Sequence, residues 1–426
     1  MLNHVQATTL DNGCRIVTSS IPRVQSLGIG FFSKTGSRLE SSRTAGHSHF
    51  LEHMLFKGSA KRSARAISEA VESRGGNMNA YTNFENTVFY AVVPSNAARI
   101  ATDVLGDMYL SPKLAATDVD CERTVILQEV GMYRDQPDAY VVDLAQQALW
   151  TKHPLGRPIL GTPEALNATT AESLGAYHHT HYNAGSTVIA AAGDISHARF
   201  LDLVAPFANR LPDGRAGTFK RADGRTSRTQ LLVDRRETEQ VQAVLGYRAF
   251  GRYDSRRYAL NLLNVILGGN MSSRLFQTVR EKHGLAYSIS SFCSFYSDTG
   301  ALQILAGLDR TRSTKALALI ASEIQRLVRT PVSKAEFERA REYVLGCLKL
   351  SLETARSHMS WIGNGTLNDQ FVTPAEAANE IKRVTREDVQ TLAQLIFIPN
   401  NTTLALVMPR TGVDEPEKHL AACFVR

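Results

Sequence analysis

Apolar residues recur along the chain in two similar series, one in each half. The first half opens with strand-like apolar stretches at 14–17 and 26–32, and the second half opens with similar stretches at 231–233 and 241–247. In each half a helical pattern follows, then a turn marked by glycine, a hairpin pattern and two further helices. This order predicts an α+β fold with two homologous domains, each an α/β sandwich with a mostly antiparallel sheet packed against helices.

The boundary between the two domains is expected near residues 206–228. This stretch carries Pro, Gly, Asp and Arg and has little apolar periodicity, which is typical of a linker. We therefore expect an N-terminal domain at 1–210, a linker at 211–228 and a C-terminal domain of the same fold at 229–426.

Candidate chemistry lies in the first helical pattern, where His49, Glu52 and His53 form H-x-x-E-H, the inverse of the H-E-x-x-H of many zinc proteases. The segment Arg43–Lys57 predicts a helix with Thr44 as a possible N-cap, so the three side chains share one face. Two neutral imidazoles one turn apart can bind one zinc ion, and the glutamate between them can take a proton from a metal-bound water. The alternative is a partly exposed helix that carries two histidines by chance.

A catalytic zinc site usually has a third protein ligand, and Glu129 is the candidate. The segment Glu122–Val130 predicts another helix, and Glu122 and Glu129 lie two turns apart on nearly one face of it. A carboxylate among apolar residues is costly to bury unless a charged group meets it. The alternative for both glutamates is an ordinary solvated helix face.

The ten residues His49–Gly58 resemble the metal-site helix of the pitrilysin family of zinc peptidases, the inverzincins, close to the mitochondrial processing peptidase beta subunit and its bacterial relatives. In that family a third metal ligand and a further glutamate stand at the positions of Glu129 and Glu122. The resemblance continues, in the same order, through the following motifs: 75–82, 155–161, 190–194, 271–276 and 280–287.

The resemblance implies one zinc ion per chain, held by His49, His53 and Glu129, with Glu52 as the general base. It implies that Glu122 orients a histidine from outside the ligand set. The second half repeats the scaffold without the metal site, because Leu345 stands where the first half has Glu129.

The resemblance also implies substrate-binding and catalytic residues beyond the metal helix. Asn79, Ala80 and Tyr81 match a family edge strand that pairs with an extended peptide by β-augmentation. Arg280 and Tyr287 match an Arg-Tyr pair that stabilises the oxygen of the scissile carbonyl. Without the resemblance, the strand is an ordinary hairpin strand and the pair is a surface arginine and a half-buried tyrosine.

Four such domains enclose a chamber in the family, and this chain supplies two of them. We therefore expect a homodimer, with a heterodimer containing an inactive homologue as the alternative. One departure from the family pattern is His47-Ser48, where small or apolar residues are usual. We expect His47 to be an incidental surface residue and not a competing ligand.

Composition narrows the remaining possibilities. The net charge of +7 is spread among interleaved acidic and basic residues, which argues against nucleic-acid binding. The five scattered cysteines predict reduced thiols, and no apolar run is long enough for a membrane span. The N-terminal residues resemble neither a signal peptide nor a transit peptide, so a bacterial cytoplasm is expected, or a mitochondrial matrix only if a presequence was removed.

Together these features predict a zinc metalloendopeptidase that hydrolyses extended peptides or unfolded segments inside a closed chamber. The alternative is a non-catalytic structural subunit of a larger complex, like the core proteins of the respiratory bc1 complex. The complete set of His49, Glu52, His53 and Glu129 favours the enzyme.

Overall fold

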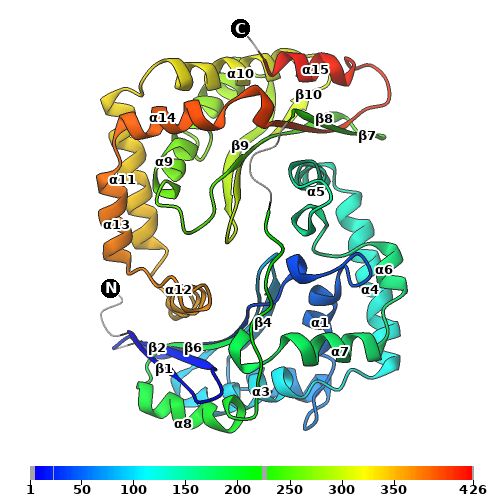
Figure 1. The fold of residues 1–426 in the computed structure, drawn as a ribbon, viewed down its shortest axis with the longest axis vertical. Coiled ribbons are helices and arrows are strands. Elements are labelled where there is room, and N and C mark those ends of the chain that lie inside the picture. The colour runs from blue at the N-terminus through cyan, green and yellow to red at the C-terminus, as the bar shows by residue number, and fades with distance from the viewer. Residues whose placement is uncertain (1–4, 23, 223–227, 425–426) are drawn as a thin grey trace. The chain divides into compact units, whose positions relative to one another are not determined.

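The computed structural model describes residues 5–22, 24–222 and 228–424 and divides into two compact units. Unit 1 consists of Met1–Val130, Arg157–Lys220 and Lys349–Pro374, and unit 2 consists of Gly131–Gly156, Arg221–Leu348 and Ala375–Arg426. Each unit combines a mixed sheet with helices (Figure 1). The expected α+β class with two similar domains is confirmed.

Unit 1 is built on a six-stranded sheet, in which only β2 and β6 are parallel neighbours. Alternate residues of its strands point to opposite faces, so that Phe31 and Phe32 of β3 belong to two different apolar clusters. In spatial order the strands are β1 (Val5–Thr9), β2 (Arg15–Ser20), β6 (Thr187–Gly193), β3 (Ser26–Ser33), β5 (Thr87–Pro94) and β4 (Asn77–Thr82).

Helices cover both faces of this sheet. The larger apolar cluster joins one face to helices from the first half of the chain: α1 (His47–Leu55), α2 (Ala64–Glu72), α3 (Ala98–Leu110), α4 (Ala116–Arg134), α6 (Pro163–Asn167), α7 (Ala171–His181) and α8 (His197–Ala208). On the other face, α12 (Ala355–Leu367) packs against β2, β3 and β6. Its Met359, Ile362 and Leu367 fill the second cluster.

Unit 2 repeats this arrangement with a five-stranded sheet, and its single parallel pair, β7 and β11, corresponds to β2 and β6. The strands in order are β7 (Gln230–Arg235), β11 (Thr402–Met408), β8 (Gln240–Ala249), β10 (Gly300–Asp309) and β9 (Ala286–Phe295). Its helices are α9 (Arg257–Leu267), the π-helix η5 (Phe276–Lys282), α10 (Ser313–Arg329), α11 (Lys334–Leu350), α13 (Pro374–Arg383), α14 (Arg386–Ile396) and α15 (Pro416–Ala422).

The opposite face of the unit 2 sheet is covered by α5 (Pro137–Leu149), which packs against β7, β8 and β11. Each unit therefore takes one covering helix from the other half of the chain, and a division into 1–210 and 229–426 omits this exchange. Part of the expected linker, residues 223–227, lies outside the described residues. Short 3₁₀ turns complete the chain: η1 (Ser37–Leu39), η2 (Ser95–Ala97), η3 (Pro154–Gly156), η4 (Ala184–Ser186) and η6 (Pro399–Asn401).

The glycine turns expected before the two hairpins are present. Gly75 precedes β4 with a φ of 74°, and Gly284 precedes β9 with a φ of 56°. Both values lie in the left-handed region that favours glycine. The five cysteines are free. None of the helices in the described parts of the chain combines the length and the apolar character that a bilayer crossing requires.

Candidate metal centre

The helix that carries the histidine pair, α1, begins at His47 and ends at Leu55, so it is shorter than expected. Gly46 is its N-cap, with a φ of 95° that glycine adopts without strain. A Cβ at Gly46 would also lie 2.8 Å from the carbonyl oxygen of Leu160. The expected cap, Thr44, was wrong: its Oγ1 accepts a hydrogen bond from the N–H of Ser41 and contacts no N–H of α1.

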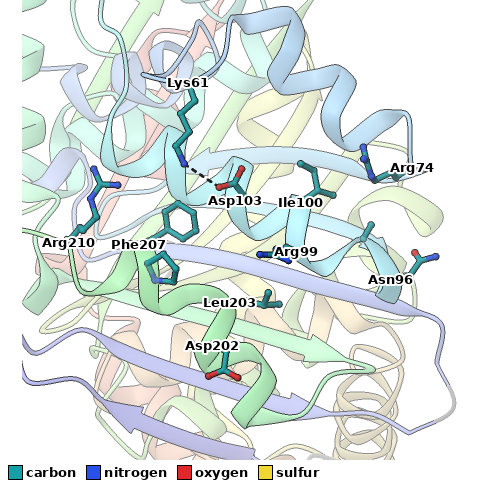
Figure 2. A pocket seen from close by; sticks show the side chains of 12 residues that line it. Lys61, Arg74, Asn96, Arg99, Ile100, Asp103, Asp202, Leu203, Phe207 and Arg210 are labelled. Carbon is teal, nitrogen blue, oxygen red and sulfur yellow. Dashed lines mark hydrogen bonds and ion pairs between the residues drawn. The ribbon is translucent and has the colours of Figure 1, made fainter.

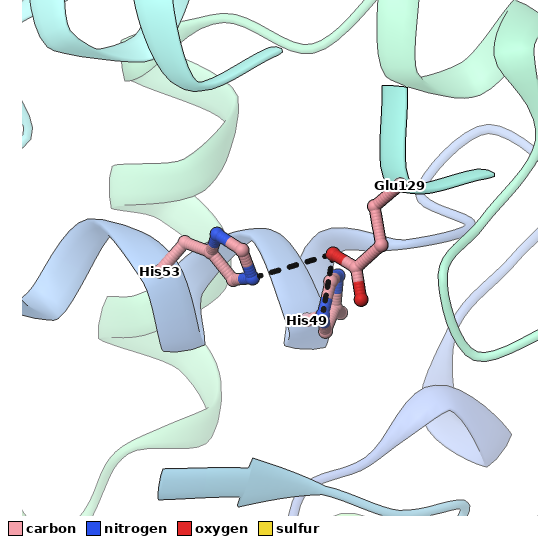
Figure 3. A group of neighbouring side chains, drawn as sticks. All are labelled: His49, His53 and Glu129. Atoms are coloured by element: carbon pink, nitrogen blue, oxygen red, sulfur yellow. Dashed lines mark ion pairs between the residues drawn. The ribbon is translucent and has the colours of Figure 1, made fainter. Parts of the chain in front are cut away.

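Three of the predicted site residues converge in unit 1 (Figure 3). The Nε2 atoms of His49 and His53 lie 3.8 and 3.7 Å from Oε2 of Glu129, which α4 contributes. Within the described residues, this is the one group of three His, Cys, Asp or Glu side chains whose ligand atoms all lie within 4.8 Å of one another. Two imidazole nitrogens and one carboxylate are a donor set suited to zinc.

The electrostatics of His49 fit such a site. Burial, followed by the nearby His53, lowers the pKa of His49 to about 3. The imidazole is therefore neutral near pH 7 and has a free lone pair on one ring nitrogen, which is the form that binds a metal. The donor set and its protonation together fit one zinc ion.

Glu122 lies behind His53, with a side chain that is only 5% exposed. Its Oε1 is 2.8 Å from Nδ1 of His53, and it also pairs with the ammonium group of Lys57. Burial raises the pKa of Glu122, but the hydrogen bonds from Lys57 and His53 outweigh this effect and lower it overall. An ionised carboxylate can only accept, so Nδ1 of His53 carries the proton and Nε2 keeps its lone pair toward the cluster.

Glu52 directly precedes His53 on α1, three positions after His49, and lies outside the group of three. The hydroxyl of Thr82, the last residue of β4, donates to Oε2 of Glu52 at 2.6 Å. Burial is the largest influence on Glu52 and raises its pKa, despite this hydrogen bond and the nearby His53. A half-buried carboxylate with a raised pKa has the affinity for a proton that a general base needs.

Asn79, Ala80 and Tyr81 lie on β4, which is an edge strand of the unit 1 sheet, as expected. Ala80 is paired with Phe89 of β5 on one side. On the other side its N–H is 2.8 Å from Oδ1 of Asn79, so a short side chain occupies that backbone donor. Tyr81 turns to the α12 face of the sheet and lies near Tyr90.

Arg280 and Tyr287 belong to unit 2 and lie close to each other in sequence. Arg280 is on the π-helix η5, with its guanidinium carbon 4.6 Å from the centre of the Phe276 ring. Tyr287 is on β9, an edge strand of the sheet in that unit, and is 78% exposed. The expectation of a half-buried packing role for Tyr287 without the resemblance is therefore wrong.

His47 is not the surface residue that we expected. It is only 2% exposed, and its ring packs edge-on against Tyr177 of α7, with the ring centres 5.6 Å apart. Burial lowers the pKa of His47 to about 4. It lies outside the three-residue group, so its place is in the packing between α1 and α7.

Two contact residues of the site had no assigned role in the sequence analysis. Thr82 was part of the quoted edge-strand motif, and its hydroxyl contact with Glu52 depends on how β4 packs against α1. Lys57 lies two residues after the end of α1, and its contact with Glu122 of α4 likewise depends on tertiary packing.

A separate cavity of about 610 Å³ lies between α3 and α8 in unit 1 (Figure 2). Arg99 and Asp103 of α3 and Asp202 and Phe207 of α8 are among the residues that line it. None of the residues of the histidine–glutamate group lines this cavity. The candidate chemistry is therefore not located there.

Comparison with known proteins agrees with the donor set. Residues 15–163 match the family model described as insulinase (peptidase family M16), and residues 168–344 match the model described as peptidase M16 inactive domain. An uncharacterized zinc protease of Bacillus subtilis, YmxG, is 39% identical over 406 residues, which cover 95% of this chain and 98% of that protein. An uncharacterized zinc protease of Streptomyces coelicolor is 38% identical over 397 residues, covering 92% of this chain and 86% of that protein.

The fold has solved counterparts as well. A protease from Helicobacter pylori superimposes with a TM-score of 0.91 at 18% identity, covering 96% of this chain and all of that chain. At this identity the likeness concerns the fold alone. The family models and the relatives named zinc protease show that the chain belongs to peptidase family M16, the pitrilysin family of zinc peptidases.

Proposed function

We propose that the protein is a zinc-dependent endopeptidase that cleaves extended peptides or unfolded segments. The observation that carries this proposal is the group formed by His49, His53 and Glu129, with Glu52 on the same turn of α1. Zinc, when bound by these three residues, supplies a Lewis acid that polarises a carbonyl and lowers the pKa of water toward about 7.

The chain's own residues perform the proton transfers. Glu52 accepts a proton at a carboxylate oxygen as water attacks the peptide carbonyl, and it then delivers that proton to the leaving amine. Glu122 keeps the proton of His53 on Nδ1, so that Nε2 remains a ligand. The hydroxyl of Thr82 donates to Glu52, so the end of the edge strand β4 is held next to the proton acceptor.

Substrate is proposed to bind along β4. An extended peptide adds there as a further strand, because the outer edge of β4 has no strand partner within the described residues. Backbone pairing at Asn79, Ala80 and Tyr81 gives affinity with little demand on sequence. Since the N–H of Ala80 is covered by the Asn79 side chain, that side chain turns away when a peptide pairs.

Arg280 and Tyr287 are proposed to stabilise the negative oxygen that forms during attack. The chain supplies two of the four domains that enclose a chamber in the family, so we expect a homodimer, or a heterodimer with an inactive homologue. Sedimentation of the purified protein tests this assembly. A fully active monomer contradicts it.

The function is tested by replacing the base. Glu52→Gln is expected to keep the fold and the zinc content but to lower peptide cleavage by about 10²-fold or more, because a neutral amide cannot accept the proton. Glu72→Gln, an exposed glutamate of α2, is the matched control and should leave cleavage unchanged. Cleavage of a fluorogenic peptide library and zinc analysis of the same samples provide the measurements.

The competing function is a structural subunit without activity. The match of residues 168–344 to a model described as an inactive domain is the observation that favours it. A wild-type protein that binds zinc and cleaves no peptide of the library supports that reading. Equal cleavage by the wild type and Glu52→Gln removes Glu52 from the mechanism.

A further inference from the structure

Glu40 is a buried carboxylate next to α1, the helix that carries His49 and His53. The proposed mechanism assigns no role to this carboxylate. It follows the 3₁₀ turn η1 and is only 4% exposed. Its two oxygens accept separate backbone hydrogen bonds, Oε2 from the N–H of Gly46 at 2.7 Å and Oε1 from the N–H of Ser48 at 2.8 Å. Both donors are at the start of α1, and His49 is the next residue.

The N-terminus of α1 needs acceptors from outside the helix. The first N–H groups of any helix have no partner within it, and the N-cap residue Gly46 has no side chain to supply one. Glu40 satisfies two of these donors with one charged group, and charge-assisted bonds of this kind are roughly twice as strong as neutral ones. A negative charge at this end also interacts favourably with the helix dipole.

The surroundings of Glu40 hold it in place. The Arg157 guanidinium donates to its backbone carbonyl. Burial raises the pKa of Glu40 to about 7, while the N–H groups of Ser48 and Gly46 and the charge of Arg157 oppose this rise. Above that pH the carboxylate is ionised, and both oxygens are then acceptors. The hydroxyl of Ser48 is 3.0 Å from the hydroxyl of Tyr177. The first turn of α1 is therefore held both by Glu40 and by Tyr177.

We propose that Glu40 is a positioning residue for the metal centre: by fixing the start of α1 it sets where His49 and His53 stand relative to Glu129. Among the described hydrogen bonds, those of Glu40 involve none of the three ligands and no residue of β4. The proposal rests on the proposed function in one respect, because it takes the three-residue group to be a zinc site. Its consequence is that zinc affinity depends on a carboxylate outside the ligand set.

The test is Glu40→Gln, which keeps the shape of the side chain and replaces one oxygen with an NH₂ group that faces a backbone N–H. At pH 8 we expect the zinc affinity, measured by competition with a chelator, to fall about tenfold, the lower end of the range for groups that orient a ligand from outside the ligand set. Hydrogen exchange of residues 46–50 in the metal-free protein should become at least about tenfold faster, since one protecting acceptor is lost. Glu40→Asp should lie between the wild type and Glu40→Gln.

Val204→Ala is the control for general destabilisation. Val204 is fully buried in α8 of the same unit, and its loss should lower the melting temperature without changing zinc affinity or exchange at 46–50. Wild-type affinity and exchange in folded Glu40→Gln overturn the proposal, and so does an equal loss of affinity in Val204→Ala. If the wild type binds no zinc, the proposed function fails, and the exchange of residues 46–50 alone decides the role of Glu40.

Discussion

Units 1 and 2 have five strands in corresponding order, yet only one of the units gathers metal-binding side chains among its described residues. The difference is concentrated on α4 and α11. Aligning the similar segments 117–123 and 333–339 places Leu345 opposite Glu129, and Glu338 opposite Glu122. Leu345 is a buried apolar residue, so unit 2 has at that position the side chain that packing alone favours.

The second pair of residues makes the same point more sharply. The Glu122 side chain is 5% exposed and contacts His53 and Lys57, whereas Glu338 is 41% exposed and pairs only with Arg341 on its own helix among the contacts described. A buried carboxylate is costly unless charged or donating groups meet it. At this aligned position the carboxylate is buried and partnered in unit 1 and largely solvated in unit 2, so the same scaffold accommodates both.

The two units also differ beside their edge strands. Unit 1 has the regular helix α2 before β4, and unit 2 has the π-helix η5 before β9. A π-helical turn widens the backbone and occurs often at functional sites. In unit 2 it carries Arg280, one of the two residues assigned to the carbonyl oxygen.

The largest expected effect concerns the exchanged helices. A fragment of residues 1–222 lacks α12, whose Met359, Ile362 and Leu367 cover one face of the unit 1 sheet. Each large side chain left uncovered there loses roughly 1.5–3 kcal/mol. We expect the fragment to show no cooperative thermal unfolding and to aggregate.

A peptide of residues 349–374 added to this fragment provides the control. It contains α12 and should restore a cooperative transition, because it replaces the missing face. A fragment that melts cooperatively near the wild-type temperature without the peptide would show that the exchange is unimportant for unit 1.

The next effect makes unit 1 resemble unit 2. Glu129→Leu removes one of three donors and introduces the residue found at 345. The zinc affinity should fall by more than the roughly 100-fold that loss of an outer partner costs, and peptide cleavage should fall with it. Chelator competition and cleavage assays measure both quantities.

The reverse change, Leu345→Glu, is the matched control. It should create no zinc site and should destabilise the protein, since it buries an unpaired carboxylate. Full zinc affinity in Glu129→Leu would mean that a different third ligand is used.

A smaller effect is expected for the outer carboxylates. Glu122→Gln should lower zinc affinity or cleavage about 10- to 100-fold, because the amide can present its NH₂ group to Nδ1 of His53 and no longer fixes the tautomer. Glu338→Gln, at the equivalent place in unit 2, should change neither quantity. Similar results for both variants would mean that the burial of Glu122 gives it no role in the metal site that the exposed Glu338 lacks.

Local and tertiary features of the site differed in how well the sequence predicted them. The prediction that His49, Glu52 and His53 lie on one helix depends only on local sequence, and α1 confirms it. The contacts of Glu52 with Thr82 and of Glu40 with Ser48 join segments whose approach depends on packing, and no periodicity reports that. The helical pattern made Glu129 only a candidate for the third ligand, with a solvated helix face as the alternative, and the family resemblance supplied the stronger reason to choose it.

The fold shows the same limit. The two repeated series of strands and helices predicted the two sheets. An apolar face on α5 or α12 indicates that the helix is covered but does not say which sheet it covers, so the exchange was missed. Thr44 was a reasonable cap by residue type, but the left-handed Gly46 and its close approach to Leu160 decide where α1 begins.

The last expected effect concerns stability and compares one titratable group on each of the two exchanged helices. On α12, His358 is bonded through Nε2 to the carbonyl of Leu352 at 2.8 Å. On α5, burial raises the pKa of Asp143 from 3.8 to about 6. Asp143 makes no hydrogen bond or ion pair with the described residues, so its ionised form is penalised by the folded unit.

The sign of the resulting pH dependence follows from the raised pKa. The unfolded chain loses the Asp143 proton near pH 4 and the folded chain near pH 6, so this group lowers stability as pH rises across that interval and by a constant amount above it. Asp143→Asn should therefore raise the free energy of unfolding at pH 8 by about 1–3 kcal/mol and leave it nearly unchanged at pH 3.5. Chemical denaturation at both pH values measures this, with the exposed Asp202→Asn as a control that should show no such difference. Equal effects of Asp143→Asn at both pH values would mean that the aspartate is solvated, and α5 would then match α12 in having no unpartnered buried charge.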